Sequence, residues 1–179
     1  MTHESRPPPP MGSRPPPPLD PPSLEELADI GLFGGLDESV LSDFVQKLPI
    51  LMLSPGDVVF REGDQGRELY VLLGGEMEVA KTSKAKTETR VAMLGPGDWF
   101  GEMSILDVLP RSATVRALAP ARVIKMSAHD LDALYRRDVK AYAIIVLNVA
   151  REMSRRLRVA DGILADLMSS VGATYSRRR

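Results

Sequence analysis

Residues 50–126 alternate between short apolar runs and turn-forming residues, and this pattern constrains the fold more than any other feature of the chain. Valine, isoleucine, leucine and tyrosine fill the runs, whereas glycine, proline and aspartate fill the breaks. Strands favour β-branched and aromatic side chains, and tight turns favour Gly, Pro and Asp. Strands are predicted at 50–53, 58–60, 69–73, 76–81, 89–94, 113–118 and 121–126. Many short strands at even spacing predict a mainly β fold, either an antiparallel sandwich or a jelly roll.

Helical patterns flank the predicted strands on both sides. Ser23-Leu-Glu-Glu26 has the spacing of a capping box and predicts a short helix, and Asp37 is expected to cap a second helix that continues to Val45. A second capping box, Ser127-Ala-His-Asp130, predicts a helix directly after the last strand. A long helix is predicted over 140–171.

The predicted helix over 140–171 carries a heptad repeat of apolar residues. These residues follow one another at steps of three and four: Ala143, Val146, Ala150, Met153, Leu157, Ala160, Leu164, Leu167 and Val171. Packing onto the chain's own domain accounts for the first half of this seam. Its length over four heptads favours pairing with a second copy, so we predict a parallel homodimer. Gly162 lies within the seam, where we expect the helix to bend or fray.

Composition excludes several kinds of site. The 179 residues include no cysteine, which excludes disulfides, thiolate zinc sites and cysteine nucleophiles. The two histidines, His3 and His129, cannot supply the histidine cluster of a metal-dependent jelly-roll enzyme. The longest apolar run, residues 141–147, is far shorter than the ~20 residues that cross a bilayer, and no secretion signal precedes it. We therefore expect a cytoplasmic protein that is not an enzyme and holds no metal.

Residues 1–22 differ sharply in composition from the rest of the chain. They hold 10 of the 15 prolines, arranged as Ser5-Arg-Pro-Pro-Pro-Pro-Met-Gly12 and then Ser13-Arg-Pro-Pro-Pro-Pro-Leu-Asp20. Consecutive prolines lack N–H donors and have a fixed φ, which predicts a disordered, extended polyproline II arm. The favoured interpretation is a solvated spacer. A docking arm for a proline-recognising partner protein remains open.

Charge divides the remainder of the chain. Residues 23–139 carry 13 basic and 19 acidic side chains, whereas residues 140–179 carry 8 basic and 3 acidic ones. The predicted organisation is therefore an acidic body over 23–139, a long helix over 140–171 and a basic tail over 172–179. The arginines of the long helix are interpreted as a solvated face.

Residues 97–115 contain the side chains best suited to bind a ligand. Gly101 permits close backbone approach, and residues 102–107 are expected to form one or two turns of helix whose free N–H groups can seat a phosphate. A proline then ends the helix and delivers Arg111 and Ser112 beside it. The guanidinium and the hydroxyl are both suitable donors to phosphate oxygens.

Glu102 needs a separate explanation, because a carboxylate beside a phosphate is repulsive. It is explained if it accepts a hydrogen bond from a sugar hydroxyl and also helps to orient Arg111. A phosphate, a sugar hydroxyl and an apolar wall together indicate a nucleotide of low charge. The alternative is that Glu102 and Arg111 form a structural ion pair in a domain that binds nothing.

The segments Phe100-Gly-Glu-Met-Ser and Pro110-Arg-Ser-Ala-Thr-Val resemble the phosphate-binding cassette of cyclic nucleotide-binding domains. The resemblance extends to Gly56-Asp-Val-Val-Phe-Arg-Glu-Gly-Asp-Gln-Gly and Leu69-Tyr-Val-Leu-Leu-Gly-Gly-Glu, and it covers roughly residues 24–164. It implies an antiparallel β-roll, which is a double-stranded β-helix of jelly-roll type. N-terminal helices and a long C-terminal helix would flank this roll.

The resemblance also implies roles for individual residues. Glu102 would hold the ribose 2′-hydroxyl, and Arg111 and Ser112 would hold the cyclic phosphate beside backbone amides of the cassette. The residues expected to bind ligand are Gly101, Glu102, Met103, Ser104, Arg111, Ser112 and Ala113.

Base selection is expected from the C-terminal helix, which covers the base in this family. Ala160 and Asp161 lie where the catabolite activator of the family has a Thr-Ser pair, so both are candidate base contacts. The Asp161 carboxylate suits the amino group of adenine or the N–H donors of guanine, and its alternative role is a solvated charge beside the seam. Cyclic AMP is the first predicted ligand and cyclic GMP the second.

The predicted function is a non-enzymatic sensor that binds a cyclic nucleotide and transmits the change to a partner protein. Only 8 residues follow Val171, so no helix-turn-helix and no sequence-specific DNA binding are expected. The alternative is a ligand-free dimeric scaffold with a degenerate cyclic nucleotide-binding fold.

Overall fold

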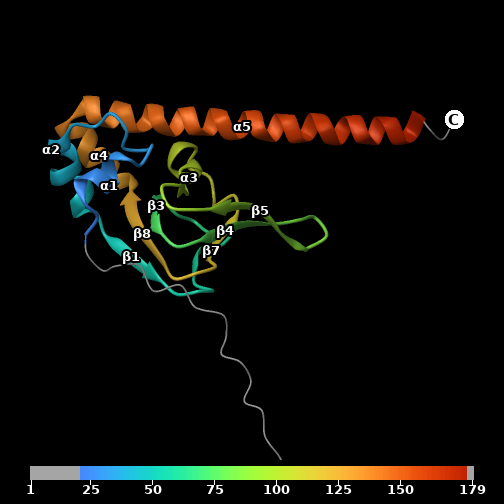
Figure 1. Ribbon diagram of the computed structural model, residues 1–179, viewed down its shortest axis with the longest axis horizontal. Helices are drawn as coiled ribbons and strands as arrows, with labels where there is room; N and C mark the ends of the chain where they lie inside the picture. The colour runs from blue at the N-terminus through green and yellow to red at the C-terminus, as the bar shows by residue number, and fades with distance from the viewer. Residues whose placement is uncertain (1–20, 177–179) are drawn as a thin grey trace, which may run out of the picture.

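The computed structural model describes residues 21–176, with side-chain surroundings through residue 169. Two antiparallel four-stranded sheets form a β-roll, with strand orders β1-β8-β3-β6 and β2-β7-β4-β5. The strands are β1 (Ile50–Leu53), β2 (Val58–Phe60), β3 (Glu68–Gly74), β4 (Met77–Thr82), β5 (Glu88–Leu94), β6 (Trp99–Phe100), β7 (Thr114–Ala117) and β8 (Ala121–Ser127). The helices are α1 (Leu24–Ala28), α2 (Glu38–Asp43), the 3-10 turn η1 (Val45–Lys47), α3 (Met103–Leu106), α4 (Ala128–Arg137) and α5 (Val139–Ser176). The predicted β-roll with flanking helices is confirmed (Figure 1).

All of the predicted strands are present, and their ends differ from the prediction by one residue at most. Strand β6 was not predicted. It pairs with β3 through Tyr70 opposite Phe100 and Val71 opposite Trp99. A strand of two residues is too short to show an alternating pattern, which explains why the sequence did not reveal it.

Of the three predicted helix N-caps, two are confirmed and one is wrong. Ser23 Oγ accepts a hydrogen bond from the Glu26 N–H at 3.0 Å, and Ser127 and Asp130 form the predicted capping box of α4. Asp37 precedes α2 but makes no side-chain capping hydrogen bond. Helix α2 ends at Asp43 and a 3-10 turn follows, so the predicted helix through Val45 was too long.

The core consists of two apolar clusters. One lies inside the roll and includes Leu72, Met77 and Phe100. The other lies between the roll and the helices and includes Phe33 and Trp99. Trp99 belongs to this second cluster, and only 6% of its surface is exposed.

Helix α5 is fixed to the body by its first three turns. Ala141, Ile145 and Val149 are buried, and Asn148 Nδ2 donates to the backbone oxygens of Leu32 at 3.0 Å and Gly34 at 2.9 Å. These residues follow i, i+4, i+7, i+8 spacing, the pattern of a helix face that packs on a core. They are not the residues of the heptad seam.

The seam lies beside the buried stripe of α5. In its first half, Val146 is half-buried and Met153 packs partly buried against the core, as expected, whereas Ala143 and Ala150 are exposed. The helix runs without interruption through Gly162, where a bend or frayed end was expected, and on through residues 172–176 of the predicted tail. Figure 1 shows this distal half of α5 as a rod that leaves the rest of the molecule.

Several expectations fall on residues outside the description or on features that can be checked only within it. The proline-rich arm before residue 21 and the final arginines, 177–179, lie outside the described residues. Within residues 21–176, no helix has both the length and the apolar character needed to span a membrane. The same part of the chain contains no group of three or more side chains suited to ligate a metal ion.

Candidate functional site

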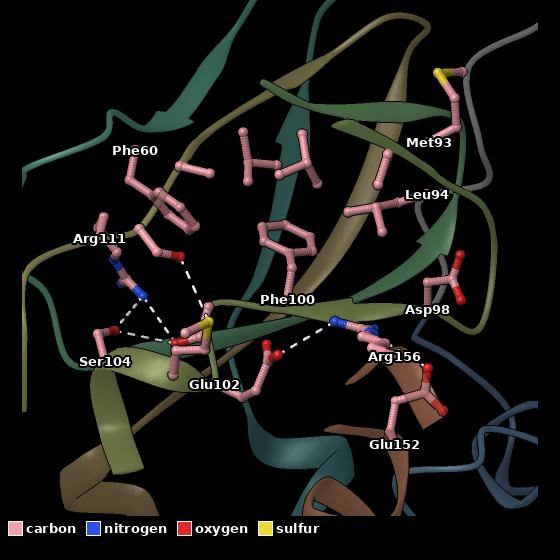
Figure 2. Close-up of a pocket in the computed structure, with 17 residues that line it drawn as sticks. Phe60, Met93, Leu94, Asp98, Phe100, Glu102, Ser104, Arg111, Glu152 and Arg156 are labelled. Carbon is pink, nitrogen blue, oxygen red and sulfur yellow. Dashed lines mark hydrogen bonds and ion pairs between the residues drawn. The ribbon is translucent and has the colours of Figure 1, made fainter. Parts of the chain in front are cut away.

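A cavity of about 380 Å³ opens between the sheet that contains β4, β5 and β7, the cassette segment and α5 (Figure 2). Its volume lies within the usual range for small-molecule sites. Every residue that was expected to bind the phosphate or ribose lines it: Gly101, Glu102, Met103, Ser104, Arg111, Ser112 and Ala113. The structure thus brings together side chains from both ends of the cassette, along with apolar residues that include Phe60 and Leu94.

Arg111 is held rigidly at one side of this cavity. Its Nη1 donates to Glu68 O at 2.7 Å, to Gly101 O at 3.0 Å and to Ser104 Oγ at 2.7 Å. Its Nη2 donates to Glu68 Oε2 at 2.9 Å, and its guanidinium carbon lies 4.1 Å from the centre of the Phe60 ring. With 4% of the residue exposed, the guanidinium is a buried and oriented cation.

One donor of this guanidinium is left over. Arg111 Nε is buried and has no hydrogen-bond partner within the described residues. A buried donor without a partner costs about 1–3 kcal/mol, so an acceptor here would be stabilising. An anionic oxygen is the strongest acceptor for a guanidinium N–H. Arg111 therefore fits a phosphate group in the cavity that it lines.

Two glycines make room for the guanidinium. A Cβ atom built on Gly66 would lie 2.7 Å from Arg111 Nη2. A Cβ atom on Gly101, whose φ is +84°, would lie 2.8 Å from Arg111 Nη1 and from Glu68 O. Gly101 therefore permits close approach, as predicted. The contact of Gly66 with Arg111 was not predicted from the sequence.

Glu102 is buried on the other side of the cavity and faces α5. Arg156 Nη1 donates to its Oε1 at 3.2 Å, and Arg156 Nη2 donates to the backbone oxygen of Trp99 at 2.9 Å. Figure 2 shows the two side chains pointing toward each other. The expectation that Glu102 orients Arg111 was wrong, because the carboxylate paired with Arg111 is that of Glu68.

Arg156 is itself held by a second carboxylate on the same helix. Its Nε donates to Glu152 Oε1 at 3.1 Å, and Arg155 Nη1 donates to the other oxygen of Glu152 at 3.1 Å. Burial alone would raise the pKa of Glu152, but the hydrogen bonds from Arg155 and Arg156 outweigh burial and hold that pKa below its usual value. Glu152 is therefore ionised at neutral pH, and it fixes Arg156 beside the cavity.

The candidate base contacts lie farther along α5. Ala160 and Asp161 are exposed, and the residues of α5 that line the cavity are Glu152 and Arg156. Ala160 follows Arg156 by one helical turn. The structure therefore does not bring Ala160 and Asp161 to the cavity, and their contact with a base stays a prediction.

Sequence reasoning missed Glu68 and Glu152, and its interpretation of the long-helix arginines as a solvated face was wrong for Arg156, which lines the cavity. Glu68 lies 43 residues before Arg111, and Arg156 lies 54 residues after Glu102, so no local motif connects either pair. The 3- and 4-residue spacings of Glu152 to Arg155 and Arg156 were visible as helix pairs. They did not indicate that the pair faces a cavity.

Comparison with known proteins agrees with this geometry. Residues 50–138 match the family model of the cyclic nucleotide-binding domain. A CRP-like cAMP-activated global transcriptional regulator of Mycobacterium tuberculosis is 32% identical over 144 residues, which cover 80% of this chain and 62% of that protein. The chain thus spans less than two thirds of the length of this relative.

Solved structures share the fold as well. The crystal structure of the Thermus thermophilus catabolite activator protein superposes with a TM-score of 0.68 and 34% identity, over 78% of this chain and 63% of that one. A cyclic nucleotide-binding domain from Methylobacillus flagellatus gives a TM-score of 0.74 and 26% identity, over 80% of this chain and 83% of that one. From its strands, its cassette and these matches, the chain belongs to the cyclic nucleotide-binding domain family.

Proposed function

We propose that this protein is a regulatory sensor that binds cyclic AMP in the cavity beside Arg111, with cyclic GMP as the second candidate. The observation that carries the proposal is a buried guanidinium with its Nε–H unpaired, which lines the same cavity of about 380 Å³ as the buried carboxylate of Glu102. A cyclic nucleotide offers one anionic phosphate and one free ribose hydroxyl. The first complements Arg111, and the second complements Glu102.

Different residues of the cavity contact different parts of the ligand in this proposal. The Arg111 Nε–H and the Ser112 hydroxyl donate to the cyclic phosphate, and backbone N–H groups at Gly101, Met103 and Ser104 lie beside it. Glu102 accepts from the 2′-hydroxyl. Ala113 and the apolar lining of the cavity cover the sugar and base. None of these roles requires bond making, so the proposed activity is binding and not catalysis.

Ligand binding in the cavity is transmitted to the rest of the protein by helix α5. Glu102 accepts from Arg156 of α5, so a ribose hydroxyl that binds Glu102 changes the environment of that ion pair. A ligand that interacts differently with two positions of α5 shifts the population between them. Such a shift would bring Ala160 and Asp161 toward the base. We propose that a partner protein senses this change, and that the cytoplasm is where it does so.

Two copies are proposed to pair through the exposed apolar seam of α5. The M. tuberculosis relative is a CRP-like cAMP-activated global transcriptional regulator. For this chain we propose a sensing role without sequence-specific DNA binding.

A ligand-free scaffold is the second candidate function. One observation favours it: the Glu102 carboxylate accepts a hydrogen bond from Arg156, so the chain itself supplies a partner for this buried acid. On this hypothesis the ion pair closes the cavity, and the domain serves only to present α5 and the proline-rich arm.

Isothermal titration calorimetry of the full chain distinguishes the two functions. Cyclic AMP is expected to give a one-site isotherm, and 5′-AMP, whose phosphate carries a second charge and no ring, is expected to bind far more weakly. Trp99 is the chain's one tryptophan and its backbone oxygen accepts from Arg156, so its fluorescence is an independent reporter. If neither cyclic nucleotide gives a heat of binding or raises the melting temperature, the sensor function is excluded and the ligand-free scaffold is the remaining candidate.

Arg156→Ala is expected to weaken cyclic AMP binding about 5–30-fold and to abolish the fluorescence response of Trp99. Loss of a partly exposed ion pair to a buried carboxylate costs about 1–2 kcal/mol, which is this range of affinity. Arg155→Ala is the matched control, because Arg155 binds the same Glu152 but does not line the cavity. Equal effects of the two substitutions on affinity would show that Arg156 acts only through helix stability.

A further inference from the structure

An apolar groove with two tyrosines lies on the face of the helical layer, away from the nucleotide cavity. We call it the tyrosine groove; it has a volume of about 300 Å³ and is lined by Ile105, Ala128, Leu131, Asp132, Tyr135 and Tyr142. The rings of Tyr135 and Tyr142 meet edge to face, with centroids 5.3 Å apart and planes at 72°. Tyr135 keeps 49% of its surface exposed, whereas Tyr142 is partly buried against the core, so the Tyr135 ring is the more accessible of the two.

One carboxylate, that of Asp132, lies at the edge of the groove. Asp132 is half-exposed, and its ion pair with Arg136 joins two surface side chains one helical turn apart. An exposed pair of this kind contributes about 0.3–0.5 kcal/mol. Another guanidinium can therefore replace Arg136 at Asp132 at little cost.

Aromatic grooves of this construction suit polyproline II segments. Such a segment is extended without internal hydrogen bonds and loses little entropy when its proline rings pack between aromatic rings. A basic residue next to the prolines adds an ion pair with the carboxylate at the edge of the groove. The fitting ligand is therefore an arginine followed by several prolines.

The chain contains that sequence twice, at Arg6 and at Arg14, each followed by four prolines. The arm enters the described fold near the C-terminal end of α4. Gln46 Nε2 donates to Pro22 O at 3.0 Å, and Asp43, three residues before Gln46, pairs with Arg137 at the end of α4 at 3.0 Å. Arg137 lies roughly 160° around α4 from Tyr135, so the arm has to pass around this helix to reach the groove.

The length of the proline-rich arm and its effective concentration near the groove both favour this arm as the ligand of the groove. At ~3.1 Å per residue, twenty residues of polyproline II extend about 60 Å, several times the ~15 Å length of α4. A tether of this length gives an effective concentration of about 1 mM. A groove with an intrinsic Kd of about 0.1 mM would then be about nine-tenths occupied.

We propose that one Ser-Arg-tetraproline octad of residues 5–20 docks in cis in the tyrosine groove. Its prolines pack on Tyr135 and Tyr142, and Arg6 or Arg14 pairs with Asp132. The proposal is independent of nucleotide binding. It assigns the arm an intramolecular site and makes its release a step that precedes capture by any other protein.

Electron–electron distance measurements on the full chain test the proposal. The chain has no cysteine, so Met11→Cys and His129→Cys introduce two unique spin-label sites, the first between the octads and the second exposed on α4 outside the groove. Labelled protein is diluted with unlabelled chain to suppress distances between copies. We expect a dominant population below about 30 Å, since either octad then holds Met11 within a few proline residues of the groove.

Substitutions in the tyrosine groove then test whether docking there produces the population with short distances. Tyr135→Ala and Asp132→Asn are expected to reduce it at least threefold, whereas Tyr135→Phe, which keeps the ring, should retain it. Circular dichroism checks that each variant is folded. The proposal fails if the short distances are absent from the parent or persist in Tyr135→Ala. It also fails if they disappear on dilution, because the arm would then occupy a second copy.

Discussion

Arg111→Ala is expected to abolish measurable cyclic nucleotide binding. The substitution removes the cation that would neutralise the phosphate, together with the buried donor that lacks a partner. Removing one member of a desolvated charge pair costs about 2–5 kcal/mol, which corresponds to a loss of affinity of about 30- to several thousand-fold. Calorimetry with cyclic AMP measures this loss directly.

The same substitution also affects the free protein, and this effect must be separated from the loss of affinity. Without the guanidinium, Glu68 Oε2 and the carbonyl oxygens of Glu68 and Gly101 lose their donor. The melting temperature without ligand should therefore fall. The decisive quantity is the further rise on adding ligand, which follows RT ln(1 + [L]/Kd) and should vanish in Arg111→Ala.

Two variants make this interpretation specific. Arg111→Lys keeps the charge but not the planar fork, so it is expected to recover only part of the affinity. Arg116→Ala removes an arginine that pairs with Glu78 and Glu88 and does not line the cavity. It should lower stability without changing affinity. If Arg111→Ala binds cyclic AMP with normal affinity, the proposed contact between Arg111 and the phosphate is wrong.

Local patterns account for what could be predicted from the sequence. The strands were predicted because β-branched runs and Gly-Pro-Asp breaks report the backbone conformation residue by residue. The cassette was identified for the same reason, since its residues from Gly101 to Ala113 form one continuous segment. Their common position on the cavity wall follows directly from that segment.

The contacts that orient these residues could not be predicted in the same way. Which carboxylate holds Arg111, and which cation holds Glu102, depends on how β3 and α5 pack against the cassette. The sequence contains 24 acidic and 23 basic side chains, so spacing alone leaves many pairings open. The buried stripe of α5 illustrates the same limit: two apolar stripes run along one helix, and only tertiary packing determines which of them faces the body.

Leu164→Glu is expected to dissociate the proposed homodimer into monomers. Leu157, Leu164 and Leu167 are 62%, 58% and 58% exposed on the distal half of α5, where no other part of the described chain covers them. A single helix of this length is marginally stable in water without packing. Pairing with a second copy removes these leucines from water and supports the helix at the same time, because the heptad spacing lets two copies interdigitate.

The size of the effect follows from symmetry. One substitution removes a leucine from each copy and places two carboxylates against each other in the seam. Each buried leucine contributes about 2 kcal/mol, so the pair contributes about 4 kcal/mol, and the dissociation constant should rise about 1,000-fold before any charge repulsion is counted. Sedimentation equilibrium at micromolar concentration measures this change.

Ser169→Glu introduces the same charge on the same part of the helix but away from the seam. At 100° per residue it lies roughly 140° around α5 from Leu164, and Ser169 is exposed. It should leave the dimer intact, because a carboxylate there stays in water. If the unsubstituted chain sediments as a monomer at these concentrations, the exposed leucines serve a different partner. The transmission of the nucleotide signal would then depend on that partner and not on a second copy.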